Sequence, residues 1–253
     1  MTIRSLIRFA SGALALCSLS QPVSAADTPA SGNVNITRWA QGTVEYRVLS
    51  TGAVNGSEEW HLTVHPDGSR TIEARNRLDE AGFQRHVTHR VAADFRPLET
   101  LASYWIQGAW RGSALFAVNG PELTAVAKTP NGMLTQTLSV PEHFSFIPHP
   151  LSTNAWHGWY YDRQKLGRQT ITVYDMDAVA KGVGSLLGRL YQQDIELLGQ
   201  EQVTTPAGTF LTDHFKIAGG VDMYITGPDA VLVRFVWEPA DRDYVLVDYA
   251  SGP

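Results

Sequence analysis

Strict alternation of apolar and polar residues is the feature that most limits what this chain can fold into. Trp60, Leu62 and Val64 alternate with polar neighbours. Successive side chains of a β-strand point to opposite faces, so this pattern places one face on a core and the other in water. The same pattern recurs at 43–48, 71–75, 83–91, 100–107, 110–118, 122–128, 133–140, 189–199, 209–217, 221–226, 231–238 and 243–249.

Short turn sequences separate many of these runs. The pairs Asn55-Gly56, Asp67-Gly68, Asn119-Gly120 and Asn131-Gly132 suit tight hairpins, because these residues tolerate positive φ angles. The pattern therefore predicts a meander of antiparallel strands, and a sheet of roughly a dozen strands must curl or close. The predicted fold class is all-β and mainly antiparallel: a curved sheet forming a barrel or half-barrel with one or two short plug helices.

Two segments depart from the alternation and are the predicted plug helices. Residues 152–165 suit a short helix capped by Ser152 or Thr153. Residues 177–190 carry apolar side chains at helical spacing after Asp175 or Asp177, either of which is a suitable N-cap.

The N-terminus is typical of a secretory signal peptide. Arg4 and Arg8 precede a short apolar stretch, and the small residues Val23-Ser24-Ala25 follow it. We expect a signal peptide at 1–25 with cleavage after Ala25, a disordered lead-in at 26–33, and a single β-barrel or half-barrel domain at 34–253. The predicted location is the periplasm, with secretion beyond the cell as the alternative. Lipidation at Cys17 is disfavoured because the large Leu16 precedes it.

Charge and cysteine content restrict the class of partner. Loss of Arg4 and Arg8 with the signal peptide changes the formal net charge from −5 to −7, and no basic block remains. This argues against nucleic acid and against electrostatic binding to anionic lipid surfaces. Cys17 is the only cysteine, so the mature chain has neither a disulfide nor a thiolate metal site. No later segment has the apolar length of a transmembrane helix, and no cofactor is predicted.

Several segments resemble one known family. The stretch 203–210, which contains Pro206-Ala207-Gly208, leads into 212–217; Pro150-Leu151-Ser152 and the opening run with Trp60 and the Asp67-Gly68 turn add to the likeness. In these segments the chain resembles the DUF3108 family of exported bacterial proteins, and the segments are spread over nearly the whole mature chain. The resemblance implies a half-barrel similar to periplasmic lipoprotein carriers, which hold acyl chains. It supplies no function and no catalytic residues.

Two polar residues of the run 83–91 are the leading candidates for ligand contacts. Arg85 and His89 share the phase of Phe83, Val87 and Val91, so they face the core or a cavity. Either they find partners in the core, or they face a ligand. The concave wall around them is expected to include Trp60, Phe83, Val87, Trp105 and Phe116, and the predicted ligand-binding residues are Arg85, His89, Trp60, Trp105, Trp156 and Trp159.

A second cluster offers groups for acid–base chemistry. His143, His149, His157, Tyr160 and Asp162 lie within one aromatic segment, and His149 or His157 could pair with Asp162. Packing of a plug explains the aromatic residues equally well. The sequence has no His-x-His or His-Glu-x-x-His motif, so no metal site is predicted.

Three functions fit these features. The preferred hypothesis is a periplasmic binding or carrier protein for a hydrophobic or amphipathic ligand, for which a lipid is one candidate. The first alternative is an enzyme with a His/Tyr/Asp site at the barrel mouth. The second is a cell-envelope scaffold that binds another protein through a sheet edge. Because no sequence motif specifies a reaction, the carrier hypothesis is favoured over the enzyme.

Overall fold

The alternating segments form one long antiparallel sheet. The computed structural model describes residues 36–79, 82–177 and 186–253, and these lie in one compact unit. The strands are β1 Arg38–Val48, β2 Val54–Val64, β3 Arg70–Leu78, β4 Phe83–Val91, β5 Pro97–Ile106, β6 Ala109–Asn119, β7 Glu122–Thr129, β8 Gly132–Ser139, β9 Ser145–Ile147, β10 Gln169–Met176, β11 Gly188–Thr205, β12 Gly208–Ile217, β13 Val221–Thr226, β14 Val231–Trp237 and β15 Arg242–Gly252.

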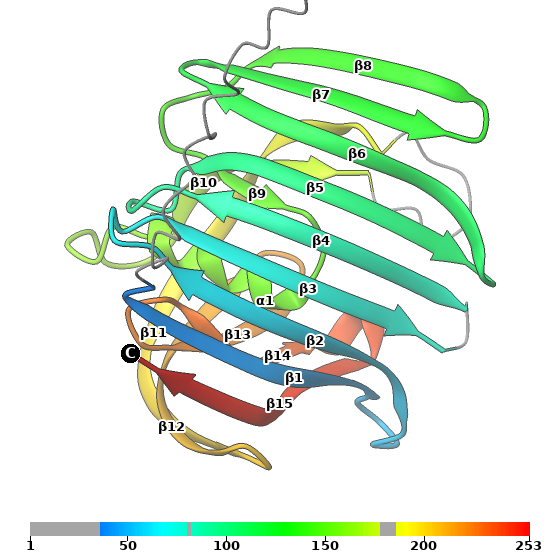
Figure 1. Cartoon of the computed structure of the whole chain (residues 1–253). Helices are drawn as coiled ribbons and strands as arrows, with labels where there is room; N and C mark the ends of the chain where they lie inside the picture. Colours follow the sequence, from blue (N-terminus) through cyan, green and yellow to red (C-terminus); the bar gives the residue numbers. More distant parts are fainter. Residues whose placement is uncertain (1–35, 80–81, 178–185) are drawn as a thin grey trace, which may run out of the picture. The chain divides into compact units, whose positions relative to one another are not determined.

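Pairing of the first and last strands joins the two halves of this sheet. The order is β8-β7-β6-β5-β4-β3-β2-β1-β15-β14-β13-β12-β11-β10-β9, so β1 and β15 lie side by side near its middle (Figure 1). All neighbouring strands are antiparallel except β9 and β10, which run parallel. The sheet ends at β8 on one side and at β9 on the other, and therefore curves without closing. This confirms the predicted fold class.

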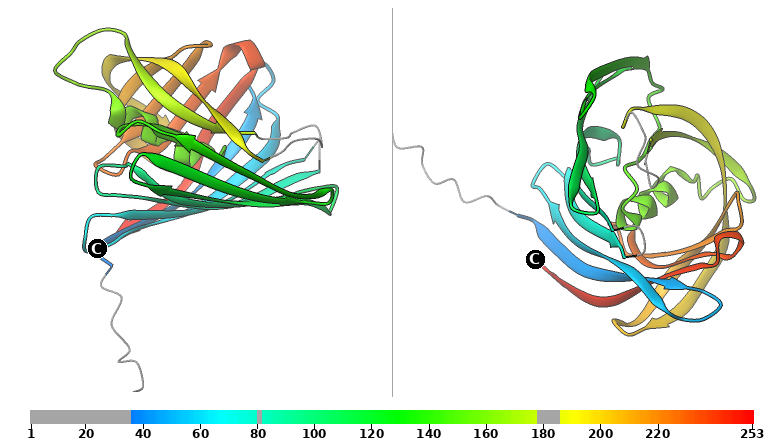
Figure 2. Two further views of the ribbon diagram at one scale, coloured as in Figure 1. Left: turned by 90° about the horizontal axis from the view of Figure 1, so that it is seen from above. Right: turned by 90° about the vertical axis from the view of Figure 1, so that its right-hand side faces the viewer.

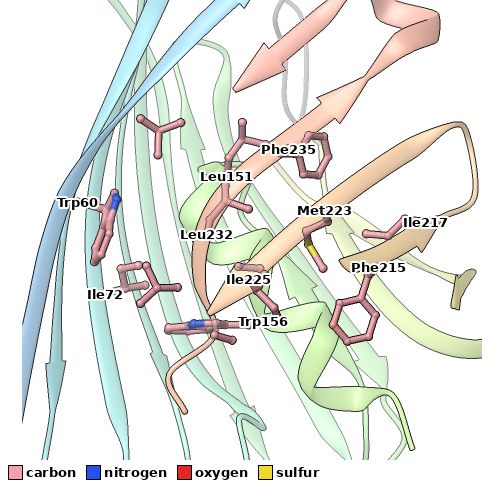
Figure 3. Close-up of a cluster of buried hydrophobic side chains, with 14 of the residues drawn as sticks. Trp60, Ile72, Leu151, Trp156, Phe215, Ile217, Met223, Ile225, Leu232 and Phe235 are labelled. Carbon is pink, nitrogen blue, oxygen red and sulfur yellow. The ribbon is translucent and has the colours of Figure 1, made fainter. Parts of the chain in front are cut away.

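A short helical segment fills the hollow of the sheet. The helix α1 (Leu151–Asn154) continues into the 3₁₀ helix η1 (Ala155–Tyr160), and the sheet curls around them (Figure 2). Leu151 and Trp156 lie between the wall that carries Trp60 and the strands that carry Phe215 and Leu232 (Figure 3). The plug thus supplies apolar surface that lets the curved sheet bury its inner face. A third short helix, η2 (Glu238–Ala240), connects β14 to β15.

Three of the four predicted turn pairs connect hairpins, and one does not. Gly68 and Gly120 lie between paired strands and Gly132 begins β8, and all three have a positive φ angle. Asn55-Gly56 instead lies inside β2, and the chain turns earlier, where Gly52 has a φ of 72°. The position of Gly56 has a packing reason, since a Cβ there would lie 2.4 Å from the carbonyl oxygen of Arg77.

The helix predictions need correction. The helical segment spans 151–160 rather than 152–165, and neither Ser152 nor Thr153 caps it; Pro150 is the N-cap and makes no side-chain hydrogen bond. The second predicted helix, 177–190, lies partly outside the described residues, but Gly188 begins β11, so its last part is a strand. The predicted signal peptide, its cleavage after Ala25 and the lead-in at 26–33 also lie outside the described residues.

The sequence interpretation missed two strands. β10 carries Ile171 and Val173 on its buried side in the usual alternation, and β9 adds three residues to its edge. Both lie next to the aromatic plug segment, where the sequence pattern predicts only a helix or a pocket. Their position makes β9 the second margin of the sheet.

Candidate functional site

Arg85 lies on the concave face in a row of polar residues that crosses four strands. In register, Glu58 of β2 lies next to Asn76, Asn76 next to Arg85, and Arg85 next to Tyr104 of β5. Arg85 is buried, and its guanidinium packs 4.7 Å from the centre of the Phe83 ring. Burial lowers the pKa of Arg85 to about 10, so the group is charged at neutral pH. Among the described residues it makes no hydrogen bond or ion pair.

Glu58 connects this row to the plug. Its fully buried carboxylate accepts hydrogen bonds from the Tyr46 hydroxyl (2.6 Å), the Leu151 amide (2.7 Å) and the Ser152 amide (2.9 Å). The first amides of a helix have no partner inside the helix, so a carboxylate from the sheet can cap them. The field of Glu58 also favours the charged form of Arg85. Glu58 therefore both fixes the plug and offsets a buried positive charge.

His89 is a core residue in this structure. Its Nδ1 atom lies 2.7 Å from Thr100 Oγ1, and its ring packs between Phe146 and Trp156. Burial lowers the pKa of His89 to about 3, so its imidazole is neutral near pH 7. Of the two outcomes left open for this position, the structure favours a partner in the core over contact with a ligand.

The four predicted tryptophans do not share one wall. Trp60 and Trp156 are buried on the concave side, and Trp156 donates from Nε1 to the carbonyl of Asp229 (3.1 Å). Trp159 is 48% exposed and stacks on Phe95. Trp105 lies on the convex face beside His86, so its predicted place in the concave wall is wrong. The reason is the alternation of β5, in which Ala102 and Tyr104 take the buried positions and Trp105 therefore points to the opposite face.

The five acid–base candidates do not converge. His143 is exposed, and His149 contacts the carbonyl of Met176 and lies 3.4 Å from Asp175. The other three also have separate partners: Ser145 for His157 (2.6 Å), the Phe95 carbonyl for Tyr160 (2.6 Å), and the Gln164 amide and Lys165 for Asp162. No hydrogen bond joins any two of the five, all of which the structure describes, so the predicted pairing of Asp162 with His149 or His157 does not form.

An apolar cleft opens at the end of the sheet where β1 and β15 meet the turn between β13 and β14. Its volume is about 560 Å³, within the range of about 300–1,000 Å³ common for ligand pockets. We call it the mouth cleft. It is lined by Thr37, Arg38, Trp39, Ala40, Phe210, Thr226, Gly227, Pro228, Asp229, Val231, Tyr249, Ser251, Gly252 and Pro253.

Two arginines share one aspartate at the rim of the mouth cleft. Arg38 donates to both carboxylate oxygens of Asp229 (2.6 Å each), and Arg70 donates to one of them (2.9 Å). Burial opposes the ionisation of Asp229, but these hydrogen bonds outweigh it and lower the pKa of the carboxyl group. Two positive charges thus face one negative charge. Arg70 is buried over Phe95, whereas the side chain of Arg38 is 37% exposed.

Neither metal binding nor a membrane span is supported by the part of the chain that the structure describes. Within 36–79, 82–177 and 186–253, no three His, Cys, Asp or Glu side chains are placed to hold a metal ion. No helix in these ranges combines the length and apolar character needed to cross a bilayer.

The sequence analysis missed Glu58, Arg38, Arg70, Asp229 and the lining of the mouth cleft. Glu58 shares the phase of Trp60 and Leu62, the same signal that identified Arg85, so it could have been found. Arg70 likewise shares the phase of Ile72 and Ala74. The ion pairs could not have been found, because Asp229 is 191 residues from Arg38 in the chain.

Comparison with known proteins supports the fold alone. No protein-family model and no curated protein matches the chain. A β-barrel-like protein of the DUF1849 family from Brucella abortus has a TM-score of 0.53 at 10% identity, with 85% of this chain and 97% of that chain covered. A DUF1089 family protein from Pseudomonas aeruginosa has a TM-score of 0.42 at 14% identity, covering 71% and 89%. The likeness to the DUF1849 protein supports a barrel-like fold for this chain, and the DUF3108 resemblance stays a prediction.

Proposed function

We propose that the protein is an exported, periplasmic binding or carrier protein for an amphipathic ligand with an anionic head. The observation that carries this proposal is the pair of guanidiniums that shares one carboxylate beside an apolar cleft. The apolar lining suits a hydrocarbon tail, and the remaining positive charge suits a carboxylate or phosphate. The secretory pattern at 1–25 supports the location.

The mouth cleft replaces the inner wall as the proposed binding site. Phe210 and Tyr249 pack edge to face at 5.8 Å, and with Trp39 they provide aromatic surface for a tail. Arg38 lines the cleft and is partly exposed, so its guanidinium can reach a ligand head while Arg70 holds Asp229 from the buried side. The rings of His89 and Trp156, two of the predicted ligand contacts, pack against each other in the core, and neither residue lines the mouth cleft.

A titration with ligands that share a tail but differ in the head tests this proposal. Dodecanoate, below its micelle concentration, is expected to change the tryptophan fluorescence of the mature protein, because Trp39 lines the cleft. Dodecyltrimethylammonium is expected to bind at least about 10-fold more weakly, since a charge-assisted hydrogen bond contributes about 1.5–3 kcal/mol. Equal binding of the two would contradict an anionic head.

Two variants with matched controls locate the site. Arg38→Gln should weaken dodecanoate binding by about 10-fold or more, whereas Arg90→Gln, which breaks an exposed ion pair with Glu99, should not. Phe210→Ala should weaken binding through loss of tail contacts, whereas the neighbouring Leu211, which is 58% exposed and outside the cleft lining, should tolerate alanine. If each variant binds like its control, the ligand does not occupy the mouth cleft.

A further inference from the structure

The strand β8 is an open edge of the sheet. It lies at one end of the strand order and pairs only with β7 among the described strands. In Figure 1 it forms the upper margin of the sheet. Six of the eight residues of β8 are exposed. The opposite margin of the sheet differs, because β9 has only three residues and two of them are buried. The backbone of β8 is thus available for pairing with another strand.

This edge lacks the features that usually prevent strand pairing. Protected edges carry charges, prolines or bulges, or are covered by another element. β8 has the sequence Gly-Met-Leu-Thr-Gln-Thr-Leu-Ser, which contains neither a charged residue nor a proline. In its pairing with β7, Gly132 lies opposite Thr129 at one end and Ser139 lies opposite Glu122 at the other. No register shift occurs between these ends, so the strand is regular throughout.

The sequence of β8 is also self-complementary. Residues 134–138 read Leu-Thr-Gln-Thr-Leu, which is a palindrome centred on Gln136. Two copies in antiparallel register about Gln136 would place Thr135 opposite Thr137 of the partner subunit and Leu134 opposite Leu138 of the partner subunit. Within residues 134–138 like residues would therefore meet, with hydroxyl next to hydroxyl and leucine next to leucine.

We propose that β8 is a homodimer interface, in which two copies of this chain pair edge to edge about a two-fold axis at Gln136. The axis is normal to the sheet, so the concave faces of both copies open to the same side. Gln136 keeps its contacts with the Tyr174 hydroxyl and the Gly188 carbonyl, because these lie on the concave side. Thr135 and Thr137 project from the convex side and are exposed.

A pair of charge variants tests both the dimer and its register. In Thr135→Lys/Thr137→Lys, each introduced lysine faces a lysine of the other copy, whereas in Thr135→Lys/Thr137→Glu each introduced lysine faces a glutamate. We expect the mature wild-type protein to sediment as a dimer at micromolar concentration. The lysine–lysine variant should dissociate with a Kd about 10-fold or more above that of the lysine–glutamate variant.

The outcomes separate the alternatives. A wild type that stays monomeric up to about 100 μM, which corresponds to less than about 5.5 kcal/mol of association free energy, would overturn the proposal. Equal Kd values for the two variants would contradict the proposed pairing of two β8 strands about Gln136, and any dimer would then form through another surface. Thermal unfolding of both variants controls for the fold, and since both positions are exposed, their unfolding midpoints should match that of the wild type.

Discussion

Replacing Glu58 with alanine is expected to lower the free energy of unfolding by about 3–5 kcal/mol, because it leaves three buried hydrogen-bond donors without their acceptor, at a cost of about 1–3 kcal/mol each. The change removes three hydrogen bonds, from the Tyr46 hydroxyl and from the amides of Leu151 and Ser152. It also removes the carboxylate whose field acts on the buried Arg85. Urea denaturation of the mature protein at pH 7 measures the effect, which is a large fraction of the stability of about 5–15 kcal/mol of a typical domain.

The neighbouring Glu59 provides the matched control. It has the same side chain on the opposite face of β2 and is exposed, so Glu59→Ala should change the free energy of unfolding by less than about 0.5 kcal/mol. Arg85→Met should partly rescue Glu58→Ala, because it removes the charge left without compensation. Equal effects of Glu58→Ala and Glu59→Ala would show that Glu58 does not connect the sheet to the plug.

His89 and His157 are together expected to make the protein about 4 kcal/mol less stable at pH 5 than at pH 7. Burial lowers the pKa of His89 to about 3 and that of His157 to about 4, whereas both titrate near 6.5 in an unfolded chain. Below pH 6.5 the unfolded state therefore binds protons that the folded state rejects, and stability falls as the pH falls. At pH 5 this amounts to about 2 kcal/mol for each histidine. Urea denaturation at a series of pH values measures the slope.

Histidine variants assign this slope. His89→Gln and His157→Gln should each remove about 2 kcal/mol of the stability difference between pH 7 and pH 5, whatever their effect on stability at pH 7. Burial also lowers the pKa of His149 to about 3, so part of the slope is expected to remain in the double variant. The exposed His61 on β2 is the control, and His61→Gln should leave the pH dependence unchanged. A wild-type slope that persists in the double variant His89→Gln/His157→Gln would mean that neither imidazole is held neutral by burial.

Local chemistry explains why the fold could be predicted from the sequence. Alternation at positions such as Trp60, Leu62 and Val64 reports directly on which face is buried, and Gly68 or Gly120 at a turn reports on positive φ. The failures came from tertiary context. The Asn55-Gly56 pair suits a turn, but the close approach of Tyr46 and Arg77 requires a glycine there within a strand.

The candidate site was only partly predictable for a related reason. The two-residue alternation of β4 correctly places Arg85 and His89 on the concave side. It cannot tell that the His89 side chain has a hydrogen-bond partner in Thr100, whereas the Arg85 side chain has none among the described residues. The mouth cleft draws its residues from both ends of the chain, as in Trp39 and Tyr249, and its charge balance depends on a contact between Arg38 and Asp229. Such contacts depend on the strand order, which one sequence does not contain.

Native mass spectrometry of the mature protein, purified without detergent from the periplasm of a bacterial host, tests the ligand proposal most directly. We expect an extra mass that leaves under denaturing conditions, ionises as an amphipathic anion, and is depleted in Arg38→Gln and Phe210→Ala but not in Arg90→Gln and Leu211→Ala. A wild-type protein that carries no bound mass, or a bound mass that all four variants retain, would contradict ligand binding in the mouth cleft.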